Sequence, residues 1–303
     1  DKGSVNANSL NKNSAEYIQA VSDLSQKAVE RRIKNMGEDF INYEDLPINK
    51  NYIVELENLN IQIRHKLNWF NSVSAYLTSD QIKILQSLPF VKSIEPVKKL
   101  YFQNDQLLTA DQQLFKTLDT NYNYGVSFTQ MNLSDVPLVH SKNINGQNVL
   151  IGILDSGFDW KLHNSLKDRN VIAEYDFIFD DSVTANQTGD SRSQDSHGTY
   201  VFSILAGFVD SILIGPAFNS SFILAKTEDI RSETHIEEDN YAAALIWMEL
   251  LGVDITTSSL GYNIFDSGYS YTYSDMDGRT TIVTKAAELA YQRGVSTFTA
   301  AGN

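Results

Sequence analysis

The chain has 303 residues, 42% of them hydrophobic and 20% charged, which is enough for one large soluble domain or two smaller ones. A formal net charge of −14 argues against a nucleic-acid partner, and the absence of cysteine excludes disulfides, thiolate metal sites and a cysteine nucleophile. No run of 18 apolar residues occurs, so the sequence predicts no membrane-spanning helix.

The N-terminal third predicts a small α+β domain over residues 14–101. Residues 1–13 are polar and without periodicity, as expected for a loose tail. Residues 14–36 carry apolar side chains at helical spacing and end at Gly37. A capping box of Thr78 and Gln81 opens a short helix. Strands are predicted over residues 52–57, 73–77 and 91–97.

Residues 102–120 lie in a stretch rich in Asn, Asp, Gln and Thr that predicts a linker between two domains. From residue 121 to 303, apolar strands alternate with helical patterns. Strands are predicted over residues 149–154, 222–226, 254–260 and 295–300, and helices over residues 197–207, 238–251 and 281–292. This alternation predicts an α/β fold with a doubly wound, mostly parallel sheet.

Three polar residues stand at the ends of these elements. Asp155 follows the buried strand 149–154, His197 opens a helix, and Asn303 follows the last strand behind Ala-Gly. An aspartate that orients a histidine, a histidine that accepts a proton and an amide aimed at an oxyanion are three parts of a serine hydrolase. Taken singly, each residue has an ordinary structural explanation, such as a turn aspartate or a structural histidine.

Together and in this order, the motifs resemble those of the subtilases, the subtilisin-like serine proteases. The matching stretches are Ile153-Leu154-Asp155-Ser156-Gly157, His197-Gly198-Thr199 and Ala300-Ala301-Gly302-Asn303. The resemblance implies Asp155, His197 and Asn303 as catalytic residues. It also implies that Ser259, Leu260 and Gly261, in a Ser-Leu-Gly stretch, bind the substrate backbone.

The N-terminal domain resembles the inhibitory propeptide of these proteases, a ferredoxin-like domain, through its Leu88-Pro89-Phe90-Val91 ending. By this resemblance the propeptide is a partner that binds in the cleft, the maturation cleavage falls within residues 102–120, and the protein is secreted or extracytoplasmic. The other implied partners are a peptide or protein substrate and the C-terminal remainder of the catalytic domain. No cofactor is implied, and calcium is expected by family resemblance only.

The chain departs from the family in one respect, because no Gly-Thr-Ser motif, which carries the nucleophile, occurs in it. We therefore expect an N-terminal piece of a longer protease precursor, with a subtilisin-like sheet that is incomplete at its C-terminus. The alternative is a catalytically inert pseudoprotease, which binds peptides or acts as a protease inhibitor or chaperone.

Acidic residues concentrate between Glu174 and Asp195, where oxygen ligands for a metal are available. Their spacing matches no calcium loop, and the five histidines show no zinc spacing. We therefore predict no metal site here and expect a solvated acidic loop.

Overall fold

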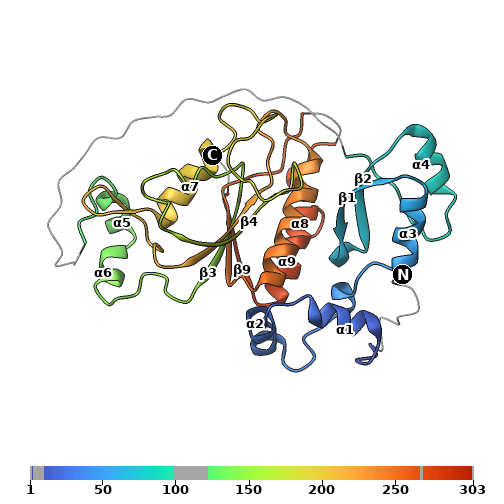
Figure 1. Ribbon diagram of the computed structural model, residues 1–303, viewed down its shortest axis with the longest axis horizontal. Helices are drawn as coiled ribbons and strands as arrows, with labels where there is room; N and C mark the ends of the chain where they lie inside the picture. Colours follow the sequence, from blue (N-terminus) through green and yellow to red (C-terminus); the bar gives the residue numbers. More distant parts are fainter. Residues whose placement is uncertain (1, 3–9, 98–121, 267–268, 302–303) are drawn as a thin grey trace. The chain divides into compact units, whose positions relative to one another are not determined.

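The computed structural model describes residues 2, 10–97, 122–266 and 269–301. The chain divides into two compact units, which are described separately (Figure 1). Unit 1 combines residues 1–99, 234–253 and 262–297, and unit 2 combines residues 100–233, 254–261 and 298–303. The predicted linker over residues 102–120 lies outside the described residues.

A five-stranded sheet in the order β4-β7-β3-β8-β9 carries the predicted α/β fold. Its strands are β3 (Leu150–Asp155), β4 (Asn170–Asp176), β7 (Ser221–Lys226), β8 (Ile255–Ser258) and β9 (Ser296–Thr299). The pairs β3–β7, β3–β8 and β4–β7 are parallel. The sheet is therefore wound outward in both directions from β3, as the alternation of strands and helices predicts.

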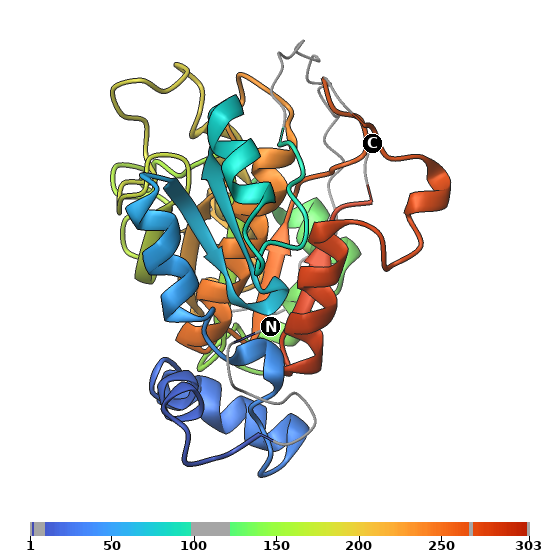
Figure 2. The same ribbon diagram turned by 90° about the vertical axis from the view of Figure 1, so that its right-hand side faces the viewer.

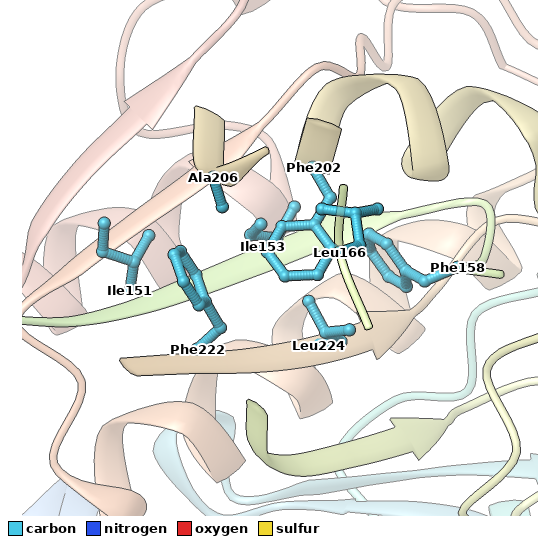
Figure 3. Close-up of a cluster of buried hydrophobic side chains, with 8 residues drawn as sticks. All are labelled: Ile151, Ile153, Phe158, Leu166, Phe202, Ala206, Phe222 and Leu224. Atoms are coloured by element: carbon cyan, nitrogen blue, oxygen red, sulfur yellow. The ribbon is translucent and has the colours of Figure 1, made fainter. Parts of the chain in front are cut away.

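Strand β3 is central because its residues from Leu150 to Leu154 are apolar on both faces, and all six of its residues are buried. Helix α7 (Ser196–Ala206) covers β3, with Phe202 and Ala206 packed into the cluster that Figure 3 shows. The ring of Phe202 lies 4.9 Å from that of Phe222 in β7, centroid to centroid. This core fixes the start of α7 against the end of β3.

Short elements that the sequence analysis did not predict complete unit 2. They are α5 (Phe128–Leu133), α6 (Val136–His140) and the hairpin of β5 (Phe208–Val209) and β6 (Leu213–Ile214). They enclose an aromatic cluster around Tyr124, whose hydroxyl lies 2.6 Å from His140 Nδ1.

Unit 1 contains the N-terminal helices and a small antiparallel sheet. Its elements are α1 (Ala15–Ser22), α2 (Gln26–Met36), η1 (Tyr43–Asp45), α3 (Lys50–Asn58), β1 (Gln62–Leu67), η2 (Asn68–Phe70), β2 (Ser72–Tyr76) and α4 (Ser79–Gln86). The predicted capping box of α4 is confirmed, with Thr78 and Gln81 bonded reciprocally.

Three predictions for this region were wrong in detail. The predicted helix over residues 14–36 is two helices, because the Ser25 side chain accepts a hydrogen bond from Ala28 N and starts α2 anew. The predicted strand over residues 52–57 is helix α3, which buries Ile53 and Leu56 on one face. No strand forms over residues 91–97, which the structure describes.

Unit 1 also includes α8 (His235–Leu251), η3 (Tyr273–Asp275) and α9 (Ile282–Gln292). Helix α8 begins with a capping box of Thr234 and Glu237 and ends at Gly252, whose φ of 92° favours glycine. It packs against β1 and α9 (Figure 2). Among the described residues, no helix combines the length and apolar character needed to cross a bilayer.

Candidate active site

Asp155 is the last residue of β3 and is fully buried. Its carboxylate oxygen Oδ1 accepts hydrogen bonds from Ser156 N at 2.7 Å and Ser156 Oγ at 3.2 Å. Its backbone oxygen accepts from Thr227 N at 2.9 Å, which ties the ends of β3 and β7 together. The carboxylate is thus held at the C-terminal edge of the parallel sheet, where such folds place their ligands.

His197 is the second residue of α7, and its Nδ1 lies 2.7 Å from Asp155 Oδ1. Because a carboxylate can only accept, Nδ1 carries the hydrogen, and the Nε2 of a neutral ring is left as a proton acceptor. The hydrogen bond to Asp155 and the charges of Asp155 and Glu228 raise the pKa of His197, while partial burial opposes them. The side chain is 54% exposed, so an outside group can reach the ring.

Gly198 explains why the helix can start so close to the strand. A Cβ atom on Gly198 would lie 2.2 Å from the backbone oxygen of Gly157 and 3.0 Å from Cβ of Asp155. Real Cβ atoms do not approach backbone oxygen to 2.2 Å, so any larger residue would push α7 away from β3. The glycine of the His-Gly-Thr motif is therefore required by the spacing of the Asp155–His197 pair.

Gln194, three residues before His197, is fully buried and was not singled out by the sequence analysis. Its Nε2 donates to the backbone oxygen of Ser156 at 2.7 Å and also to that of Glu228. Its Oε1 accepts from Ile230 N at 3.2 Å. This amide joins the turn after Asp155, the loop after β7 and the entry to α7. No local pattern marks such a residue, because its partners lie in other segments.

Lys226, the last residue of β7, organises the acidic stretch before His197. Its Nζ lies 2.8 Å from Asp176 Oδ2 and 2.7 Å from Asp190 Oδ2, and the side chains of all three residues are at most 2% exposed. Burial raises the pKa of Asp176, against the hydrogen bonds that it accepts from Lys226 and from Ile178 N.

The expectation of a wholly solvated acidic loop was wrong for Asp176 and Asp190, because a buried ammonium holds them. Glu174 is also engaged, by Lys161, Trp160 Nε1 and Thr184 Oγ1. In the described part of the chain, no three His, Asp or Glu side chains are grouped to hold a metal ion. Within this stretch, the carboxylates of Glu174, Asp176 and Asp190 are bound by protein groups. A lysine at the end of the apolar run Phe222–Ala225 is the signal that could have revealed this arrangement.

The proposed substrate residues follow β8, the strand next to β3. Ser258 of β8 is in register with Leu154, and its backbone oxygen accepts from Ala300 N at 3.0 Å. Ser259 and Gly261 are exposed and Leu260 is half-buried; a Cβ on Gly261 would have nothing within 4 Å. Asn303 lies outside the described residues.

Two family models match the sequence. The model described as the subtilase family matches residues 146–303, a little more than half of the chain. The model described as "Peptidase S8 propeptide domain, Bacteroidota" matches residues 5–112. No curated protein matches the chain in sequence.

Solved structures with the same fold are proteases. Fervidolysin from Fervidobacterium pennivorans, a keratinolytic enzyme related to subtilisin, is 19% identical with a TM-score of 0.54. The epidermin leader peptide processing serine protease EpiP from Staphylococcus aureus is 15% identical with a TM-score of 0.55. Each similarity covers 84% of this chain, which spans 38% of the length of the first and 58% of the second.

At these sequence identities, the similarity to solved structures establishes the fold alone. The family is established by the subtilase family model, which matches residues 146–303. That model covers the buried strand, the Asp155–His197 pair and the Ser-Leu-Gly stretch. The N-terminal region matches a propeptide of the same peptidase class. The chain belongs to the subtilase family, a family of serine proteases.

Proposed function

We propose that this chain is the N-terminal part of a secreted subtilisin-like endopeptidase precursor, which hydrolyses peptide bonds with an Asp-His-Ser triad. The observation that carries the proposal is the 2.7 Å contact between His197 Nδ1 and Asp155 Oδ1 at the C-terminal edge of the sheet. The serine is supplied by sequence beyond residue 303.

In this mechanism His197 Nε2 takes the proton of the serine hydroxyl as the oxygen attacks the scissile carbonyl. The ring becomes positively charged, and the buried carboxylate of Asp155 stabilises that charge and holds the ring orientation. His197 then gives the proton to the leaving amine. Asn303 donates its side-chain amide to the oxyanion of the tetrahedral intermediate.

Substrate binding is assigned to Ser259, Leu260 and Gly261. An extended peptide can add to this segment as a further strand, so that main-chain hydrogen bonds supply affinity with little demand on sequence. The exposed backbone at Gly261, with open space at its Cβ position, supports this assignment.

The N-terminal region acts as the propeptide, a partner that inhibits the enzyme until the chain is cut within residues 102–120. Hydrolysis by the triad needs no cofactor. Calcium is proposed on family resemblance alone and is assigned to no residue of this chain.

The test uses the full-length protein and two assays. Peptide hydrolysis measures activity, and a fluorophosphonate probe labels an activated serine, which the intact mass of the labelled protein reveals. His197→Ala and Asp155→Asn are each expected to lower peptide hydrolysis by about 10⁴-fold or more. The control is His163→Ala, which removes an exposed histidine bonded only locally to Ser165. Normal hydrolysis by His197→Ala would refute the mechanism. A wild-type protein that neither takes the probe nor cleaves peptides would instead be an inert peptide-binding or chaperone module.

A further inference from the structure

Glu249, near the end of α8, is fully buried and is held by two arginines of α2. Arg32 binds both oxygens of this carboxylate with one edge of its guanidinium, Nε to Oε1 at 2.9 Å and Nη2 to Oε2 at 2.6 Å. Arg31 also donates to Oε1, and its Nη1 donates to the backbone oxygen of Val253 at 2.6 Å. Bidentate arginine–carboxylate pairs of this kind are strong and geometrically specific.

The same network continues through Asp45 of η1. Asp45 Oδ1 accepts from Arg32 Nη2 at 3.1 Å and from Arg293 Nε at 2.8 Å. The side chains of Arg32, Asp45 and Arg293 are at most 4% exposed, and the guanidinium of Arg293 lies over the ring of Trp69. Four buried charges thus alternate in sign, Glu249, Arg32, Asp45 and Arg293.

These charges come from two regions of different kind. Arg31, Arg32 and Asp45 lie in the region that matches a propeptide, and Glu249 and Arg293 lie in the region that matches the protease. A backbone hydrogen bond from Ser25 N to Leu250 O at 2.8 Å joins the same two regions and uses a carbonyl that the end of α8 would otherwise leave free.

The small sheet contacts α8 at a different place. His65 Nε2 lies 2.9 Å from Asn240 Oδ1, and Ser74 Oγ donates to Asp239 Oδ2 at 2.7 Å. Asn240 and Glu249 are nine residues apart on one helix, about 14 Å along its axis. The N-terminal region therefore holds α8 at two separate points, through the sheet and through the network.

We propose that residues 26–46, here called the helical anchor, are a second binding element of the propeptide. The anchor binds the C-terminal ends of α8 and α9 through the buried ion network, and this contact is separate from the one that the β1–β2 sheet makes. The role of the anchor in maturation rests on the proposed function: in a protease precursor, the propeptide is released only when this ion network breaks. Its binding does not depend on catalysis.

Two linked contacts bind more tightly than either alone, because the second forms at a high effective concentration. Loss of the network is costly for another reason. Removing one partner of a buried ion pair leaves the other charged and without water. A cut in the linker alone should therefore leave the two pieces associated.

The experiment uses the whole chain, with a recognition sequence for a site-specific protease placed within residues 102–120. After the cut, the dissociation constant of the two pieces is measured by fluorescence anisotropy on dilution. Arg32→Met and Glu249→Gln are each expected to raise it by about 100-fold or more. The double variant should not exceed the single ones, because it removes both charges of the pair and strands neither. The control is Lys34→Met, which removes an exposed charge from the same helix and should change nothing.

The two variants lie on opposite pieces, so they separate binding from folding. Weakening by Arg32→Met alone would mean that α2 had unfolded, and would overturn the proposal. Dissociation constants equal to that of Lys34→Met would overturn it as well. Circular dichroism of each cut variant checks that its helices persist. The dissociation constant does not depend on catalytic activity. An inactive full-length protein would therefore refute the proposed function without affecting the proposal for the helical anchor.

Discussion

Replacing Lys226 with methionine should destabilise the loop that leads to His197 far more than an ordinary charge removal would. The Lys226 ammonium lies 2.8 Å from Asp176 and 2.7 Å from Asp190, and none of the three side chains exceeds 2% exposure. Methionine preserves most of the volume but leaves two buried carboxylates facing each other without a cation. Breaking a buried pair in this way costs about 3–5 kcal/mol, a large part of a typical stability of about 5–15 kcal/mol.

The matched control is Lys161→Met at the same edge of the sheet. Lys161 pairs with Glu174, but its side chain is 61% exposed. Glu174 also keeps Trp160 Nε1 and Thr184 Oγ1 as donors. Exposed ion pairs contribute at most about 1 kcal/mol, so this variant should remain close to the wild type.

Amide hydrogen exchange over residues 177–196 measures the free energy of opening this loop separately from the rest of the chain. The cost of Lys226→Met should shrink between pH 7 and pH 5. Burial already raises the pKa of Asp176, and without the ammonium a proton taken up by the two carboxylates relieves their repulsion. An opening free energy within about 1 kcal/mol of the Lys161→Met value, or a cost that grows as the pH falls, would refute this reasoning.

Three further predictions concern the site itself. In Gly198→Ala the new methyl group overlaps the Gly157 oxygen, so we expect a loss of about 1–3 kcal/mol in unfolding free energy and at least about 100-fold lower activity of the full-length enzyme. Asp155→Asn should lower the raised pKa of His197, read by NMR titration of the ring, and an unchanged pKa would contradict the assigned hydrogen bond. In the wild type this pair stabilises the fold fully below the ordinary histidine pKa, and the contribution disappears as the pH rises through the raised folded value. Gln194→Ala should lower the free energy of unfolding by about 1–3 kcal/mol, because it leaves buried backbone groups without hydrogen-bond partners. Chemical denaturation measures that loss.

The buried strand and its acidic end could be predicted from the sequence because they depend on local pattern. Residues 150–154 are apolar throughout, which only a strand covered on both faces requires. Asp155 and His197 could be identified because each opens or ends an element within a short motif. The pairing of the two side chains could then be expected from the topology of a parallel sheet.

The residues that support the pair could not be found in the same way. Gln194 and Lys226 act through partners 34 to 50 residues away in sequence. Nothing next to Gln194 in the chain shows that it is buried, and the apolar run before Lys226 does not identify the acidic partners of that lysine. Helix α3 was predicted as a strand because residues 52–56 include β-branched and aromatic side chains. The Asn49 cap and the spacing of Ile53 and Leu56 favoured a helix, and tertiary packing decided between them.

The ion network of the helical anchor has a consequence for when the parts of the molecule can form. Asp155 and His197 are 42 residues apart, whereas Arg32 and Glu249 are 217 apart. Closing the longer loop costs about 1.5 kcal/mol more in chain entropy. At synthesis rates of about 5–20 residues per second, Arg32 leaves the ribosome some 10–40 s before its carboxylate partner. The first helices to be made are therefore among the last to find their binding site, and the Asp155–His197 pair can assemble before the anchor closes.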